Sequence, residues 1–193
     1  MTPFTTVRSR AVILDEPNID TDRIIPARFL TTTSSDGLGA FAFRDVRFRD
    51  DGTPIPEHPF HRPEAEGASI IVAGHNFGCG SSREHAAWAL RDLGIRVVIS
   101  SRIADIFKAN AARNGLLPVE IDDVSHRALL RRPTVELEVD LDAGVIRAEG
   151  IDAIPFEIDG FMRRCLLDGV DHLGYLLGWM EEIEAFDRRR LPA

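Results

Sequence analysis

The sequence predicts an α/β domain with a largely parallel central sheet, and three observations support this. Two short runs, residues 68–74 (ASIIVAG) and 96–100 (RVVIS), are almost wholly apolar, as in strands buried on both faces. Each is followed by a stretch of helical character that ends at a glycine, first Gly94 and then Gly115. A third apolar run, residues 117–121, follows, and strand–helix–strand repeats of this kind join parallel strands by right-handed crossovers.

The N-terminal part predicts one strand and one interrupted helix. Residues 10–14 form a short apolar run that ends near Pro17 and Asn18, so we expect a strand and then a turn. Residues 19–30 have helical character, but Pro26 lies among them and makes any helix short or kinked.

Residues 31–67 form the least regular part of the chain, with repeated prolines and glycines. A long irregular segment inside a compact domain is usually functional or mobile. Apolar residues recur along it, so we expect it to pack on the domain rather than to be free; they include Leu38, Phe41, Phe43, Phe48 and Phe60.

The C-terminal part changes character. Residues 135–140 (VELEVD) alternate in polarity and predict a strand that pairs with residues 145–148 through a tight turn. Residues 156–178 are predicted to be helical in pieces, and a charged tail follows them. The sequence shows no repeat and no clear linker, so residues 1–193 are expected to form a single domain with a helical C-terminal tail.

The composition excludes several functions. The chain has 23 Lys and Arg against 31 Asp and Glu, a net charge of −8, whereas proteins that bind nucleic acid or anionic membranes present basic surfaces. No apolar run approaches the roughly 20 residues of a membrane helix. The first ten residues also lack the apolar core of a signal peptide. We therefore expect a cytoplasmic protein that binds neither nucleic acid nor membranes.

The two cysteines of the chain also indicate a cytoplasmic protein. Cys79 and Cys165 form no C-x-x-C pair and are too few for a disulfide framework. Two thiols are also too few to hold a four-iron cluster. We expect free thiols, a reducing compartment and no metal bound by this chain.

The most informative segment is residues 78–85 (GCGSSREH), which join a buried strand to a predicted helix over residues 81–93. Glycines at 78 and 80 permit a sharp turn and close approach of a ligand. Free amides and the helix dipole favour an anion there. Arg83 is poorly placed for that dipole, and two-pronged binding of a carboxylate would explain it.

A purely structural role is the alternative for the same residues. Ser81 and Glu84 have the spacing of a capping box, which is worth about 1 kcal/mol and requires no ligand. The Gly-Lys-Ser/Thr of a phosphate-binding loop and the third glycine of a dinucleotide fingerprint are both missing. The motif alone leaves capping and anion binding open.

Residues 76–86 (NFGCGSSREHA) closely resemble the signature of the aconitase swivel domain, and more narrowly that of the small subunits of bacterial 3-isopropylmalate dehydratases. The resemblance extends over nearly the whole chain. The other matching blocks follow in the same order: residues 18–26 (NIDTDRIIP), 101–107, 114–118 (NGLLP), 156–159 and 165–169 (CLLDG).

The resemblance implies a swivelling β/β/α three-layer fold and a hydro-lyase activity. Members of this family isomerise 2-isopropylmalate to 3-isopropylmalate by dehydration and rehydration, in leucine biosynthesis. A large subunit carries a [4Fe-4S] cluster whose open iron binds the substrate hydroxyl. The small subunit supplies the base and part of the carboxylate pocket, so this chain is expected to work in a heterodimer and to self-associate when isolated, through an exposed apolar interface.

The same resemblance assigns roles within the motif. Ser81 corresponds to the catalytic base, which acts as an alkoxide and needs its negative charge stabilised. Ser82 and Arg83 would bind a substrate carboxylate, and Gly80 would lie beside it. His85 is open between a pocket role and a structural one.

Two further sets of residues have weaker assignments. Asp20 and Asp22 are expected to support the site or to cap the local turn. In this family the segment that here spans about residues 31–47 lies over the variable group of the substrate. Leu38, Ala40 and Phe41 are expected to form an apolar wall for an isopropyl group.

The sequence departs from the usual family pattern at residues 44–47 (RDVR), and His75 stands where an arginine is common. These departures leave open a related dicarboxylate hydratase, of the citraconate or homoaconitate type. A non-enzymatic module that binds an anion through the same loop is the alternative from a different class.

Overall fold

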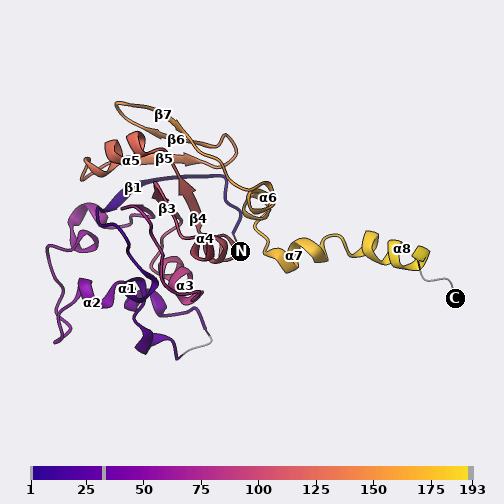
Figure 1. Ribbon diagram of the computed structural model, residues 1–193, viewed down its shortest axis with the longest axis horizontal. Helices are drawn as coiled ribbons and strands as arrows, with labels where there is room; N and C mark the ends of the chain where they lie inside the picture. The colour runs from indigo at the N-terminus through magenta and orange to yellow at the C-terminus, as the bar shows by residue number, and fades with distance from the viewer. Residues whose placement is uncertain (1, 32–33, 191–193) are drawn as a thin grey trace.

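Within the described residues, a seven-stranded sheet with the order β4-β3-β2-β1-β5-β6-β7 organises the chain (Figure 1). The computed structural model describes residues 2–31 and 34–190, so Thr32 and Thr33 of the predicted irregular segment and the last three residues of the tail lie outside it. The strands are β1 (Thr6–Leu14), β2 (Ile70–Ala73), β3 (Val97–Ser100), β4 (Leu117–Glu120), β5 (Glu136–Asp140), β6 (Val145–Ala148) and β7 (Ile151–Pro155).

The sheet has two halves that meet in β1. Residues 11–14 of β1 pair in parallel with β2, and β3 and β4 continue in parallel; we call β1 to β4 the parallel half. Residues 6–10 of β1 pair antiparallel with β5, and β6 and β7 follow as antiparallel neighbours; β5 to β7 form the antiparallel half. The predicted α/β class is confirmed, and the parallel order applies to the first half.

Helices cover the parallel half, with α3 and α4 as the crossovers between its strands. The helices are α1 (Thr21–Ile24), α2 (Arg44–Arg47), α3 (His85–Asp92), α4 (Asp105–Arg113), α5 (Asp123–Leu130), α6 (Gly160–Asp168), α7 (His172–Leu177) and α8 (Met180–Arg190). The 3-10 turn η1 (Ala27–Phe29) follows α1, and three more lie in the described part of the irregular segment: η2 (Leu38–Phe41), η3 (Pro59–His61) and η4 (Pro63–Ala65).

Every residue of β2 and β3 is buried because the sheet is covered on both faces. Ile71 and Val98 belong to a core cluster shared with α1, α3 and α4. Their neighbours Ile70 and Val97 belong to a second cluster, shared with the antiparallel half and with Leu129 of α5. This double burial explains why these strands appear in the sequence as continuous apolar runs.

Several predicted boundaries change. The first strand starts at Thr6, four residues before the predicted one, because its N-terminal half pairs with β5. Helix α5 and strand β7 were not expected from the sequence. The predicted interruption near Pro26 is confirmed: α1 ends at Ile24, and the 3-10 turn η1 follows.

The C-terminal residues leave the body of the protein. Helices α7 and α8 extend away from the sheet in a line, and neither contains a buried residue (Figure 1). We call residues 172–190 the C-terminal arm. Among the described residues, every helix is too short or too polar to cross a membrane.

Candidate active site

The loop that follows β2 lies at the carboxyl edge of the parallel half, where ligands bind in sheets of this type. It lies between the segments that follow β1 and β3 and forms isolated bridges with both. On one side, the Gly78 amide donates to the Ile19 carbonyl at 2.7 Å. On the other side, the Phe77 amide donates to the Arg102 carbonyl at 3.1 Å. The predicted motif is therefore fixed on both sides by backbone hydrogen bonds.

Glycine is required at positions 78 and 80 of the motif for different structural reasons. Gly78 has a positive φ of 74°, and a Cβ atom there would lie 2.4 Å from Cγ of the buried Phe107 ring. Gly80 has a φ of 98°, which favours glycine, but an added Cβ would meet its nearest atom, Cβ of Asp20, at 3.4 Å. Gly78 is therefore fixed by packing and conformation, and Gly80 by conformation alone.

The predicted capping box at Ser81 is wrong. Helix α3 begins at His85, four residues later than expected, and residues 81–83 are not helical. The Glu84 carboxylate accepts a hydrogen bond from Nδ2 of Asn114, at 2.8 Å, instead of reaching back to Ser81. Within the described chain, the half-buried Ser81 hydroxyl has no hydrogen-bond partner.

Two buried side chains hold the backbone around Ser81. The hydroxyl of Thr21, 1% exposed, accepts a hydrogen bond from the Ser81 amide at 3.1 Å. Nδ2 of Asn110, 7% exposed, donates to the Ser82 carbonyl at 3.2 Å. We call these two residues the clamp. They give the segment tertiary hydrogen bonds in place of helical ones, which is why the helix starts late.

The charged groups of the site are Arg83 and two aspartates, Asp20 and Asp22, from the segment that follows β1. The Arg83 guanidinium forms an ion pair with Asp22, in which both side chains reach solvent. Asp20 instead caps α1, where its carboxylate accepts from the Arg23 amide at 2.7 Å. The structure therefore separates the two predicted supporting residues: one holds a short helix, and the other holds the arginine of the motif.

The remaining predicted pocket residues lie close to this segment. Gly80 is exposed beside Ser81. His85 is the first residue of α3, is half-buried, and has its ring 4.7 Å from the ring of Trp88. The indole of Trp88 donates to Oδ1 of Asn114 at 2.9 Å, so α4 also holds this part of α3.

The donor groups of the described chain do not fit an iron–sulfur cluster. No group of three or more His, Cys, Asp or Glu side chains in its described part is arranged to hold a metal ion. Burial and the charge of Asp20 raise the pKa of the Cys79 thiol, which disfavours the thiolate that a metal requires. Burial likewise raises the pKa of Cys165, on α6.

The predicted specificity residues divide into two groups. Leu38 is a correction: its side chain is 2% exposed and packs in the core, so it anchors the segment rather than facing a ligand. Ala40 and Phe41 are exposed, and the Phe41 ring stacks on Phe29 at 4.2 Å.

Gly39 fixes this segment to the end of α3. Its amide donates to the Asp92 carboxylate at 2.7 Å, and a Cβ atom at Gly39 would lie 2.5 Å from the Leu93 amide nitrogen. Such close contact between backbones requires glycine.

Sequence reasoning missed Thr21, Asn110, Asn114 and Gly39. Two polar side chains four residues apart on one helix, Asn110 and Asn114, were the available signal for a buried polar contact.

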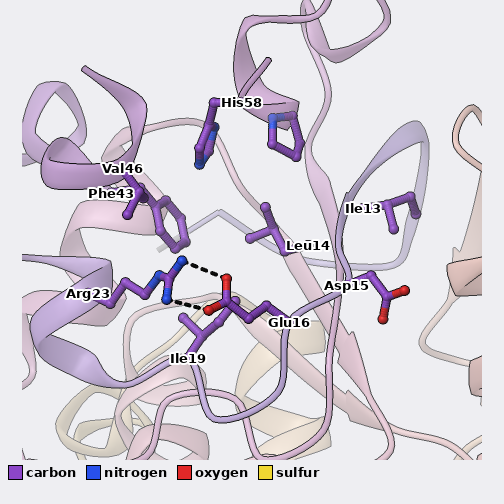
Figure 2. Close-up of a pocket in the computed structure, with 10 residues that line it drawn as sticks. Ile13, Leu14, Asp15, Glu16, Ile19, Arg23, Phe43, Val46 and His58 are labelled. Carbon is purple, nitrogen blue, oxygen red and sulfur yellow. Dashed lines mark hydrogen bonds and ion pairs between the residues drawn. The ribbon is translucent and has the colours of Figure 1, made fainter. Parts of the chain in front are cut away.

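A separate cavity of about 180 Å³ lies between the end of β1 and the irregular segment (Figure 2). Its walls are mainly apolar, and Arg23 and Glu16 form a two-pronged ion pair across its lower side. Burial, followed by the nearby Arg47, lowers the pKa of His58 to about 4, so this lining residue is neutral at pH 7. None of the three motif residues 81–83 lines this cavity.

Comparison with known proteins gives a consistent picture. Residues 1–124 match the family described as the aconitase C-terminal domain. The chain is 53% identical to the 3-isopropylmalate dehydratase small subunit of Anaeromyxobacter dehalogenans, covering 98% of this chain and 100% of that protein. Identity to the Geobacillus kaustophilus small subunit is 47%, covering 100% of this chain and 99% of that protein.

Solved structures agree with the sequence relatives. The crystal structure of a 3-isopropylmalate dehydratase from Methanocaldococcus jannaschii superposes with a TM-score of 0.69 at 28% identity, covering 96% of this chain and 99% of the other. Similarity in fold and in sequence over almost the full length leads to one assignment. The chain belongs to the family of 3-isopropylmalate dehydratase small subunits.

Proposed function

We propose that this chain is the small subunit of a cytoplasmic hydro-lyase that isomerises 2-isopropylmalate to 3-isopropylmalate, with Ser81 as its base. The reaction and the need for a large subunit follow from the family to which the chain belongs. Both cysteines are free thiols, which suits a reducing compartment. The roles of single residues are our inference from the geometry.

The observation that carries this proposal is the uncommitted hydroxyl of Ser81. Thr21 and Asn110 fix the backbone on either side of it, while the hydroxyl itself makes no hydrogen bond in the described chain. A group that is rigidly placed but unpartnered is suited to proton transfer, since no existing bond must break. As an alkoxide, Ser81 would remove the proton from the carbon next to a carboxylate as the hydroxyl leaves the neighbouring carbon, and would return it during rehydration.

Arg83 is the group best suited to bind a substrate carboxylate. Its guanidinium already engages the carboxylate of Asp22, and that pair is open to solvent. Surface ion pairs contribute little net stability, so a substrate carboxylate can take the place of Asp22 at little cost. The exposed Ser82 hydroxyl lies beside it in the chain and would donate a second hydrogen bond.

The dicarboxylate's apolar branch would lie against Ala40 and Phe41. Both are exposed on η2, and Gly39 holds that turn against the end of α3. We place the [4Fe-4S] cluster on the large subunit, because two thiols with raised pKa values do not supply its ligands.

The test is a substrate panel on the chain alone and on the chain reconstituted with its large subunit. We expect no turnover from the chain alone, and interconversion of 2- and 3-isopropylmalate by the pair. Citraconate and cis-homoaconitate serve as the competing substrates. A pair that assembles but converts neither isopropylmalate isomer would refute the leucine assignment.

A further inference from the structure

The C-terminal arm has an apolar surface that the rest of the chain leaves uncovered. Of the eleven large hydrophobic residues that are exposed in the described chain, seven lie on the arm, although it is only a tenth of the sequence. They are Leu173, Leu176, Leu177, Trp179, Met180, Ile183 and Phe186. So strong a concentration marks an interaction surface rather than scattered surface residues.

These residues are arranged as a ridge. Leu173, Leu176, Leu177, Met180 and Ile183 follow the spacing of one helix face. Gly178, at the end of α7, keeps helical dihedrals of φ −63° and ψ −18°, and α8 starts two residues later at Met180. The ridge therefore runs along both helices of the arm.

A helix of this kind needs a covering partner. Helix α7 has six residues and α8 has eleven, neither has a buried residue, and Figure 1 shows both extending beyond the sheet. Isolated helices shorter than about 12–15 residues are marginal in water. The exposed apolar side chains offer on the order of 600 Å² and, with their polar neighbours, approach the ~800 Å² per partner of a stable interface.

We infer that the arm docks on the large subunit of the same enzyme and holds the two chains together, an inference that rests on the proposed function. The extent of the family matches favours this partner. The aconitase-domain match ends at residue 124, before the antiparallel half and the arm, whereas relatives named as small subunits match over 98–100% of this sequence. The part of the chain that these small subunits share therefore includes the arm.

The base of the arm is also continuous with the site that the large subunit must cover. Helix α6, from which the arm leaves, packs on α4. On α4, Asn110 donates to the Ser82 carbonyl. A partner that meets the substrate at Ser81 is therefore one helix away from the base of the arm.

A second copy of this chain is the rival occupant. Helix α8 begins with Glu181 and Glu182 and ends with Arg188, Arg189 and Arg190, so two antiparallel copies would match in charge. The same pattern is what the dipole of a single helix favours, so it requires no second copy.

The test compares a ridge variant with a matched control in the reconstituted enzyme. The ridge variant combines Leu176→Asp and Ile183→Asp, and the control is Val124→Asp, the same kind of change at a 71% exposed position on α5. Binding to the purified large subunit is measured by calorimetry, and the mass of each small subunit alone by light scattering. Activity is measured as a function of small-subunit concentration.

We expect the ridge variant to bind the large subunit at least tenfold more weakly, with the control unchanged. Its activity should reach the wild-type plateau at high small-subunit concentration, because Ser81 and Arg83 are untouched, and its thermal unfolding should match the wild type. Unchanged binding would overturn the inference, and loss of a small-subunit dimer in that case would assign the ridge to a second copy. A wild-type pair that assembles through the arm but fails the substrate panel would refute the proposed function and leave this inference standing.

Discussion

Among the described strands, the parallel half of the sheet has four and the antiparallel half three, and the two halves carry different features. In the parallel half, β2 and β3 are buried at every position, and the loop after β2 contains the glycine turn and Arg83. The clamp residues Thr21 and Asn110 lie on α1 and α4, the helices that follow β1 and β3. In the antiparallel half, β5 alternates buried and solvent-facing residues, and its polar face carries ion pairs such as Arg147 with Glu138.

This difference shows where polar chemistry can be placed in such a fold. A strand that is buried on both faces has no position for a functional polar side chain, so those side chains collect in the loops at its carboxyl end. A strand with one solvated face distributes its polar residues along its length, where they remain individually exposed. The comparison predicts that substitutions in the first half change turnover and that those in the second do not.

The largest effect is expected from Ser81→Ala. Loss of a positioned general base should reduce turnover about 10²–10⁴-fold. The melting temperature should stay close to the wild-type value, because the Ser81 hydroxyl makes no hydrogen bond in the described chain. Steady-state kinetics at saturating large subunit and thermal unfolding measure the two quantities. Turnover that survives while melting drops by several degrees would restore the capping role.

A smaller loss is expected from Arg83→Lys, which keeps the charge but removes the two-pronged geometry. We expect kcat/KM to fall about 10²-fold, mostly through KM, as for loss of a charge-assisted carboxylate contact. Asp22→Asn removes the present partner of Arg83 and is the control. If the Asp22 variant loses as much activity as the Arg83 variant, the ion pair itself is the functional unit.

Breaking the clamp should cost both stability and rate. Thr21→Val removes the oxygen that accepts from the Ser81 amide and leaves that amide unpaired, a cost of about 1–3 kcal/mol. We expect kcat to fall about tenfold because Ser81 is less well placed, with little change in KM. Thr21→Ser keeps the acceptor and should recover most of both. Equal turnover in the Val and Ser variants would show that the clamp is only structural.

The pH dependence of stability should depend on His58, in the cavity beside β1 (Figure 2). Burial lowers the pKa of His58 from 6.5 to about 4, so the unfolded chain binds the extra proton first and stability is lost as the pH falls from 6.5 toward 4. After allowance for partial exposure, the loss is about 1–2 kcal/mol. Urea unfolding at pH 7 and pH 4.5 measures it, and His58→Gln should remove most of the difference. An unchanged difference would exclude His58 as its source.

The smallest effect is expected in the antiparallel half. Glu138→Gln removes the partner of both Arg8 and Arg147, yet all three side chains lie at the surface, where ion pairs contribute little. Turnover should equal that of the wild type, and the melting temperature should barely move. A loss of activity here would break the division between the two halves.

The parallel half was also the more predictable from sequence. Its apolar runs are continuous, and the glycines after α3 and α4, Gly94 and Gly115, mark where those helices end. Helix α5 has only eight residues, half of them apolar, and Asp122 caps it, so its short pattern was present in the sequence but was not recognised. Strand β7 buries only Ile154, ends in a proline and lies at the edge of the sheet, where it pairs with β6 alone among the described strands.

The site was predictable in its members but not in its local conformation. The residues 81–84 fit a capping box, and local propensity favours a helix there. Tertiary hydrogen bonds with Thr21, which accepts, and Asn110, which donates, override that propensity, and both side chains come from segments far away in the sequence. Likewise, Leu38 and Phe41 are similar in hydropathy, and only packing decides that one is buried and the other exposed.

The position of β1 across both halves has a consequence for how the chain is made. Residues 11–14 can pair with β2 once about seventy residues have been synthesised, but residues 6–10 must wait for β5, at residues 136–140. During translation, residues 6–10 therefore stay unpaired after β2 has been made, while a further third or so of the chain is synthesised. Unpaired strand edges are prone to aggregation during such delays. Arg8 and Arg10, at alternate positions of this edge, both carry a positive charge, which disfavours aggregation of the edge until β5 has been synthesised.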